Sequence, residues 1–200
     1  SYGEISDVCL KRKLRNRLQD IGEKILVQSN ERADDGCDSI RSRVEANPAM
    51  DKPLKMKDKE QGRTRIFAEE ACKAWIDVRS FGQVFALKEA KKQGVDAVSV
   101  GVRGPVTLHT AVSLDPVTIT GIQITKSVNN EPGDKKGSDT MGMKYRVDFG
   151  VYKFQGSINV QLAEKTGFSD EDAAKVKEAL LTIFENDASS ARPEGSMEMS

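Results

Sequence analysis

The sequence is poor in the residues that build metal sites and disulfide frameworks. It holds three cysteines and one histidine in 200 residues, and Cys9, Cys37 and Cys72 are widely spaced, with no CxxC pair. Neither a zinc site nor a disulfide framework is indicated, and this cysteine usage fits a reducing cytoplasm. The sequence also lacks a P-loop and a dinucleotide-binding fingerprint, which argues against a small-molecule enzyme. We expect no metal and no cofactor.

Long apolar runs and an excess of one charge are missing as well. No stretch of about 18 apolar residues is present and no signal peptide is visible, so we expect a cytoplasmic protein without a membrane span. Lys and Arg number 31, as do Asp and Glu, so the net charge is zero. Nucleic-acid binding would therefore have to rest on segregated charge. Segregation is visible, because the chain is basic near its start and acidic at residues 169–172 and 185–187.

The most informative stretch is residues 7–18, which read as a helix with Leu10, Leu14 and Leu18 on one face. Its cations have no acid among them: Lys11, Arg12, Lys13, Arg15 and Arg17. Such a helix can dock on a core while presenting a dense positive surface to a phosphate backbone. A solvated basic face without a partner is the alternative that charge alone leaves open.

Two stretches follow that differ in apolar content. Residues 28–62 are poor in apolar side chains and predict an inserted, mobile region with one short helix. Residues 63–77 return to helical spacing, which favours Trp75 as a core residue over a base-stacking platform. Downstream, Arg79 offers a fork suited to phosphate, Gly82 permits close backbone approach, and Arg103 lies on a bend between glycines.

The second half predicts strands. Residues 106–114 alternate, with Val106, Leu108, Val112 and Leu114 on one face and Thr107, His109 and Ser113 on the other. His109 reads as a structural or RNA-facing residue, because no partner for a catalytic base can be argued. Residues 119–128 and 144–154 form further strands, joined by a connection much longer than a hairpin turn. The connection and its flanks include Lys126, Met141, Met143 and Lys144, and the methionines can wedge between bases; a floppy surface loop is the alternative.

The C-terminal part predicts a strand at residues 156–162 and then a helix. Ser169 is its expected N-cap, with acids in the first turn and an apolar stripe through Val176. Residues 188–195 form a loop of small residues whose only cation is Arg192.

Six stretches together resemble the backbone subunit of type I CRISPR Cascade complexes, closest to the I-C form of the "Cas-seven" family. They are residues 6–16 (SDVCLKRKLRN), 77–82 (DVRSFG), 101–106 (GVRGPV), 140–143 (TMGM), 162–169 (LAEKTGFS) and 184–192 (FENDASSAR). The match keeps its order over nearly the whole chain. Relatives usually have a strand before the basic helix and another beyond Arg192, and both are expected to be missing here. Relatives often carry a cation where this chain has Met143.

The resemblance implies an α+β fold. It is a single domain over residues 1–200, with a modified RRM-like (ferredoxin-like) palm, a finger-type insertion at residues 28–62 and a thumb hairpin at residues 124–146. It further implies copies that polymerise along CRISPR RNA and present the guide to target DNA, with other Cascade subunits as partners. The expected RNA-binding residues are Lys11, Arg12, Lys13, Arg15, Arg17, Arg79, Ser80, Gly82, Arg103, His109, Lys126, Thr140, Met141, Met143, Lys144 and Arg192.

Two functions remain open from the sequence. A non-enzymatic RNA scaffold needs spaced cations and base wedges, which the chain offers. A CRISPR RNA endoribonuclease on the same fold needs a general acid and base near the scissile phosphate, for which one histidine gives little support. The scaffold is the favoured hypothesis, with no catalytic residue expected.

Overall fold

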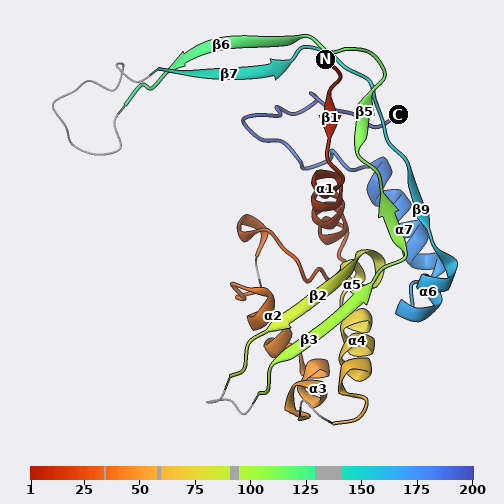
Figure 1. Ribbon diagram of the computed structural model, residues 1–200. Helices are drawn as coiled ribbons and strands as arrows, with labels where there is room; N and C mark the ends of the chain where they lie inside the picture. The colour runs from red at the N-terminus through yellow and green to blue at the C-terminus, as the bar shows by residue number, and fades with distance from the viewer. Residues whose placement is uncertain (34, 58–59, 91–94, 129–140) are drawn as a thin grey trace. The chain divides into compact units, whose positions relative to one another are not determined.

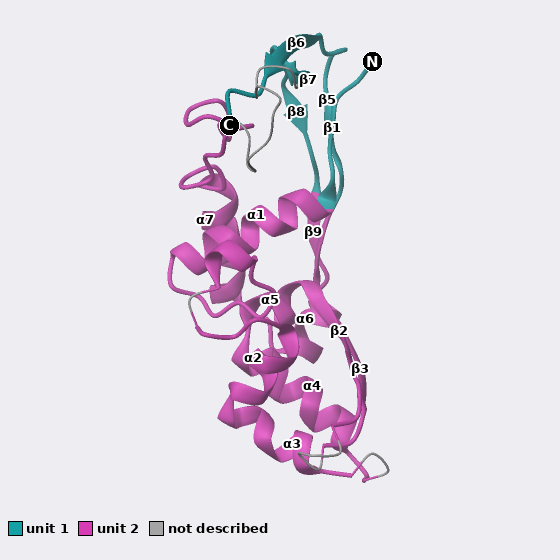
Figure 2. Cartoon of the chain, turned by 90° about the vertical axis from the view of Figure 1, so that its left-hand side faces the viewer, with its two compact units in different colours: residues 1–7, 109–155 teal, residues 8–108, 156–200 magenta. Residues whose placement is uncertain are grey.

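The computed structural model describes residues 1–33, 35–57, 60–90, 95–128 and 141–200. It combines helices and strands (Figure 1), so the predicted α+β class is confirmed. The backbone divides into two compact units (Figure 2): unit 1 comprises residues 1–7 and 109–155, and unit 2 comprises residues 8–108 and 156–200. None of the helices in the described ranges has the length and apolarity needed to cross a bilayer.

Unit 1 consists of strands. β1 (Glu4–Ile5), β5 (Ala111–Ser113) and β8 (Tyr152–Lys153) form an antiparallel sheet in the order β1-β5-β8. β6 (Ile119–Thr125) and β7 (Met141–Val147) pair antiparallel as a hairpin. The expectation that no strand precedes the basic helix is wrong, because β1 ends just before that helix begins.

The alternating segment at residues 106–114 is two strands rather than one. β4 (Val106–Leu108) belongs to unit 2, and β5 begins after His109 and Thr110, which are both exposed. Two exposed residues in succession shift the alternation by one position. Ser113 is therefore buried while Leu114 is 56% exposed, the reverse of the prediction. The Ser113 hydroxyl accepts from the Gly3 N–H at 2.9 Å and donates to the Asp115 carbonyl at 2.7 Å, which makes its burial tolerable.

Unit 2 holds the helices. The predicted basic helix is α1 (Asp7–Asp20), and its leucine stripe is buried as expected. The other helical elements are η1 (Asn30–Arg32), α2 (Ile40–Ala46), η2 (Pro48–Met50), α3 (Asp51–Lys55), α4 (Arg63–Ala74), α5 (Ile76–Phe81), α6 (Val160–Thr166) and α7 (Asp170–Leu181). Two antiparallel ribbons complete the unit: β2 (Gly82–Leu87) with β3 (Val98–Arg103), and β4 with β9 (Gly156–Ile158).

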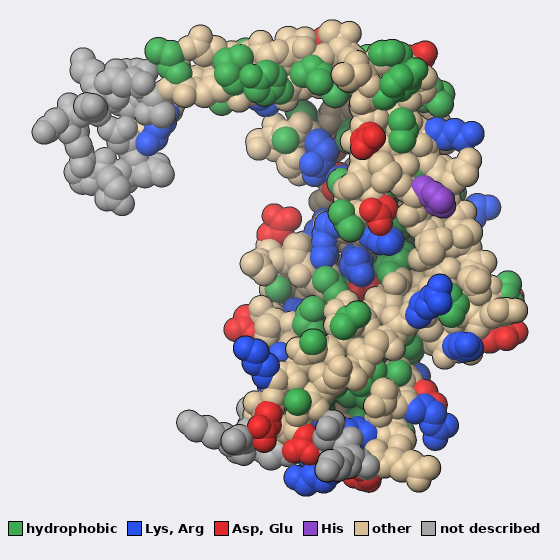
Figure 3. Space-filling view, viewed as in Figure 1, with side chains coloured by type: hydrophobic (Ala, Val, Ile, Leu, Met, Phe, Trp, Pro, Cys, Tyr) green, Lys and Arg blue, Asp and Glu red, His purple; other side chains and the backbone are tan. Residues whose placement is uncertain are grey.

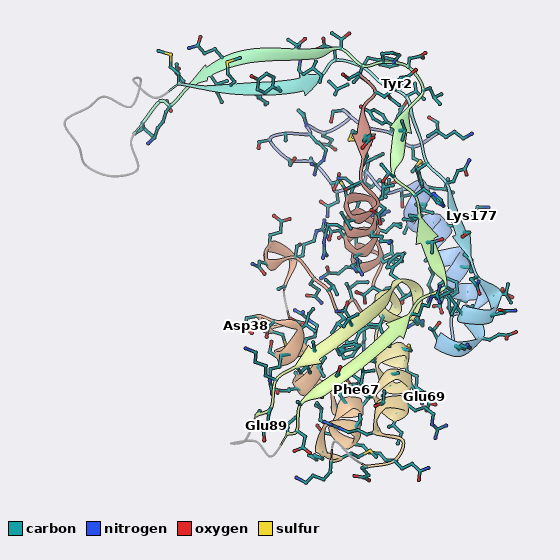
Figure 4. The ribbon with its side chains drawn as sticks, in the orientation of Figure 1. Tyr2, Asp38, Phe67, Glu69, Glu89 and Lys177 are labelled. Carbon is teal, nitrogen blue, oxygen red and sulfur yellow. The ribbon has the colours of Figure 1, made fainter. Side chains whose placement is uncertain are left out.

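The main core of unit 2 lies between α4 and the β2–β3 ribbon. Phe67, labelled in Figure 4, meets Phe85 edge to face, with 5.0 Å between the ring centroids. Trp75 belongs to this core and is only 3% exposed, so its predicted structural role is confirmed. Buried aromatic pairs of this kind contribute through both area and quadrupole geometry.

Residues 28–62 also contribute to this core, and the expectation of one short helix there is wrong. The described part holds α2, α3 and two single turns, and it buries Val44, Met50 and Leu54. These apolar residues belong to three separate short elements, α2, η2 and α3, so no single helical repeat runs through them. Each of the three side chains packs into the core, because even a short helix can bury one or two side chains.

α6 and α7 pack around a second cluster, made of Val106, Ala163, Phe168 and Val176. Ser169 caps α7 as predicted: its hydroxyl accepts from the Asp172 N–H while the Asp172 carboxylate accepts from the Ser169 N–H. The strand predicted at residues 156–162 ends at Ile158, and α6 begins at Val160 because Asn159 caps it.

Candidate nucleic-acid interface

The cations of α1 meet acids from distant parts of unit 2. Lys13 pairs with Asp187, Arg17 Nη2 lies 2.6 Å from Glu185 Oε2, and Arg15 Nε lies 3.1 Å from Asp77 Oδ2. The dense positive surface expected of this helix is therefore largely neutralised from within. Figure 3 nonetheless shows several cationic side chains lying side by side near the middle of the view.

Of these cations, Lys13 is the one most deeply buried and most firmly held by the fold. It is 5% exposed, and its ammonium lies 5.7 Å from the centre of the Phe184 ring in addition to pairing with Asp187. The structure thus places Lys13 inside the fold rather than on a surface that faces a ligand. A buried ion pair is costly to break, because the partner left behind is an uncompensated charge.

Asp77 organises the middle of α1. Its carboxylate is fully buried and accepts from the N–H groups of Leu26 and Val27 at 2.8 and 3.1 Å, besides Arg15. Asp77 therefore has little remaining capacity to compensate a second cation. The Arg15 guanidinium also lies over the Phe81 ring, with 5.1 Å from Cζ to the ring centre, which fixes its orientation.

Arg12 lies beside this arrangement. Its Nη1 donates to the Val27 carbonyl at 2.6 Å, and within the described residues no carboxylate forms an ion pair with it. Burial lowers the pKa of Arg12, the charge of Arg15 lowers it further, and Asp77 opposes both. Asp77 thus pairs with Arg15 and acts on Arg12 only through its charge. This part of α1 retains excess positive charge, which suits a phosphate.

Arg79 is held by a structural partner. Arg79 makes a two-pronged ion pair with Asp172, with Nε and Nη2 distances of 2.8 and 2.7 Å. Hydrogen bonding to Asp172 is the main cause that raises the pKa of Arg79, with burial opposing it. Ser80 is fully buried. The fork suited to phosphate is occupied by a carboxylate of α7, which joins α5 to that helix.

Gly82 does permit a close backbone approach, but the backbone that approaches it belongs to this chain and not to a ligand. It has φ of 78°, and a Cβ there would lie 2.4 Å from the Val102 carbonyl oxygen and 2.7 Å from the Gly104 nitrogen. The glycines at 82 and 104 therefore allow α5 to enter β2 directly against the end of β3. Arg103 ends β3 and is exposed.

The remaining predicted residues lie in different places. His109 is exposed in unit 1, where its N–H donates to the Gln155 carbonyl at 2.8 Å. Arg192 is partly buried in unit 2, with Nε 3.4 Å from Asp187. Lys126 follows β6 and is partly buried. Thr140 lies outside the described residues.

The β6–β7 hairpin separates its side chains between two faces. Met141 pairs with Thr125, Met143 with Gln123 and Tyr145 with Gly121, so these side chains share one face. Lys144 and Arg146 occupy the other. Figure 3 shows apolar side chains along the hairpin, and Tyr145 is 67% exposed. The sequence reading missed Tyr145, although its spacing of two from Met143 could have revealed it.

Comparison with known proteins decides the family. The sequence model of the CRISPR-associated protein Cas7 family matches residues 1–200, the whole chain. The chain belongs to the Cas7 family. A CRISPR-associated protein Cas7 of Haloferax volcanii is 26% identical over 200 residues, covering 94% of this chain and 56% of the relative. The chain thus spans about half the length of that Cas7 relative.

A solved structure described as a CRISPR RNA-guided surveillance complex, pre-nicking, contains a chain with 15% identity and a TM-score of 0.48. The match covers 96% of this chain and 66% of the other. Among the described residues, no group of three or more His, Cys, Asp or Glu side chains is arranged to hold a metal.

Proposed function

We propose that this chain is a non-enzymatic, multi-copy scaffold subunit that binds CRISPR RNA in a type I Cascade surveillance complex, closest to the I-C form. Copies polymerise along the guide RNA in the prokaryotic cytoplasm and present it for pairing with target DNA, together with other Cascade subunits. Family membership over the whole chain supports this role. Because the scaffold must accept any guide, binding is largely independent of sequence and rests on phosphate contacts.

The observation that carries the proposal is the positive charge of Arg12, which lies on α1 beside Arg15. Arg15 pairs with Asp77, and no carboxylate forms an ion pair with Arg12 among the described residues. A phosphate supplies the missing counter-charge and accepts hydrogen bonds in the geometry that guanidinium favours. Lys11, also half-buried on α1, extends the same positive stretch.

The hairpin supplies the second part of the proposal. Residues 124–146 act as a thumb whose methionine face wedges between guide bases. Lys144, on the opposite face, attracts the phosphate backbone of the RNA. Residues 28–62 serve as the finger-type segment of an RRM-like palm. In the part of the hairpin that the structure describes, the wedge residues are Met141 and Met143, which are 65% and 53% exposed.

The test is a titration of the full chain with single-stranded RNA at several salt concentrations. Wild type should show a steep fall in affinity with salt. Arg12→Gln should weaken binding about tenfold, the loss of one charge-assisted hydrogen bond, and should reduce the salt slope by about 0.7. Arg65→Gln is the control, since Arg65 is an exposed cation of α4 that pairs with Glu69.

Affinity of the wild type that barely responds to salt would contradict the phosphate-contact proposal. So would equal effects of Arg12→Gln and Arg65→Gln, because net charge alone would then explain them. Several copies bound to one RNA of defined length support the scaffold. A discrete cleavage product of precursor RNA would instead favour an endoribonuclease.

A further inference from the structure

Two partners of different kinds hold the guanidinium of Arg17. Its Nε donates to the Thr182 hydroxyl at 2.8 Å, and its Nη2 donates to the Glu185 carboxylate at 2.6 Å. The Thr182 hydroxyl donates in turn to the Glu178 carbonyl at 2.8 Å, so its lone pairs face Arg17. The neutral partner therefore orients the guanidinium independently of the charged one.

Two of the acids that pair with α1, Asp187 and Glu185, lie close together in sequence but differ in how firmly they are held. Asp187 has 14% of its side chain exposed and pairs with the buried Lys13. Glu185 has 62% of its side chain exposed, so water can replace the protein around it. Ion pairs with an exposed partner contribute little to stability, whereas buried ones are costly to open. Of the two pairs, only that of Glu185 can open without disturbing the fold.

The backbone beside Glu185 is fixed, so that opening needs only a side-chain rotation. Asn186 adopts a left-handed conformation with φ of 54°, which Asn tolerates better than most residues. Its carbonyl accepts from Arg32 Nη2 at 3.1 Å, and its amide donates to Asp20 at 3.4 Å. The chain is thereby anchored to the end of α1 on one side of Glu185, and Ile183, 1% exposed, anchors it on the other.

We propose that Glu185 is an internal competitor of RNA phosphate for Arg17. Carboxylate and phosphate oxygens accept from guanidinium in the same geometry, so one can replace the other. When the Glu185 side chain swings into solvent, Thr182 keeps Nε in place and Nη2 becomes available to a phosphate oxygen. The inference rests on the proposed function, in which α1 contacts the RNA backbone. It adds a device that weakens non-productive binding of polyanions.

The competition predicts a gain of function on removing an acid. Glu185→Gln should raise RNA affinity about threefold to fivefold, the range expected for loss of an exposed competing ion pair. The salt slope should also steepen, by up to about 0.7. In wild type, the counterion that the phosphate releases is partly offset by a cation that the freed Glu185 carboxylate takes up. In Glu185→Gln no carboxylate is freed, so the full release is seen. Glu185→Asp keeps the charge and should bind RNA much as wild type does.

Two further variants separate competition from other effects. Glu69→Gln removes the same charge from an exposed ion pair of α4 (Glu69 is labelled in Figure 4), and it should leave the salt slope unchanged. In an Arg17→Gln background, Glu185→Gln should have no effect on affinity. Both comparisons use the full chain and the same RNA.

Each outcome bears on the inference. If wild type binds with a steep salt slope but Glu185→Gln binds equally or more weakly, Glu185 is not a competitor and only the inference fails. An equal gain from Glu69→Gln would also overturn it, because net charge would be the cause. If neither wild type nor Glu185→Gln binds RNA, the proposed function and the inference fail together.

Discussion

Replacement of Asp77 by Asn should destabilise unit 2 by about 3 to 5 kcal/mol, the cost of breaking a buried ion pair from one side. Three donors face the Asp77 carboxylate: the N–H groups of Leu26 and Val27, and Arg15 Nε. An amide offers one oxygen, and its NH2 group points at a donor, so at least one buried N–H loses its acceptor. That loss costs about 1 to 3 kcal/mol, and the charge-assisted bond to Arg15 contributes a similar amount.

The single tryptophan makes this measurement specific to unit 2. Trp75 is buried in the main core of that unit, so its emission reports unfolding there during a urea titration. With an m value of about 2 kcal/mol/M, the midpoint should fall by roughly 2 M while m stays constant. Asp51→Asn is the matched control, since Asp51 is exposed and pairs with Lys55 one helical turn away. Its effect should stay below about 1 kcal/mol.

A loss for Asp77→Asn as small as that for Asp51→Asn would refute the reasoning. It would mean that the three hydrogen bonds at Asp77 contribute no more than a surface ion pair. The result also bears on variants of α1, because Ala at Arg15 removes one of those same three bonds. Loss of RNA binding by such a variant is informative only when its stability has been measured.

Two further predictions concern the β2–β3 ribbon and the pH dependence of stability. Gly104→Ala should unfold at a lower urea concentration than wild type, because its Cβ would lie 2.4 Å from backbone atoms of residues 80–82. Gly101→Ala is the control: a Cβ there meets open space, so this variant should be neutral or slightly stabilising. Equal urea midpoints for the two variants would contradict the close approach at Gly104. For Asp172, burial raises the pKa, but hydrogen bonds from Arg79 and Ser169 outweigh it and hold the pKa below its usual value. The stabilisation is therefore present above the unfolded-state pKa of about 3.9 and is lost as pH falls through the lower folded pKa. Asp172→Asn should accordingly be less stable than wild type at pH 7 and should approach wild type in acid; a stability difference that is independent of pH would contradict this.

Local features of the fold could be predicted from the sequence. The leucine spacing of α1, the cap at Ser169 and the core position of Trp75 all follow from helix geometry and capping chemistry. Each depends on residues within a few positions of one another. The structure bears out these predictions because local geometry is decided by neighbours in the chain.

The strand phase at residues 106–114 shows where local reasoning ends. The alternation of side chains was visible, but two consecutive exposed residues reversed it, and Ser113 became the buried residue. The burial depends on hydrogen bonds to Gly3 and Asp115, one of which spans 110 positions. The two-residue repeat of a strand predicts that side chains alternate between faces, but it does not predict the residue at which the buried face changes.

The amino-acid sequence alone establishes that α1 is an amphipathic helix rich in cations, and it places the chain in its family. Which cations remain available depends on the folded chain, because their partners lie far away in sequence. Asp77 is 62 positions from Arg15, Asp172 is 93 from Arg79, and Asp187 is 174 from Lys13. Helix periodicity is set by a repeat of 3.6 residues, whereas a carboxylate reaches a guanidinium only after the intervening chain has folded. The count of charges therefore follows from the sequence, and their compensation follows from the fold.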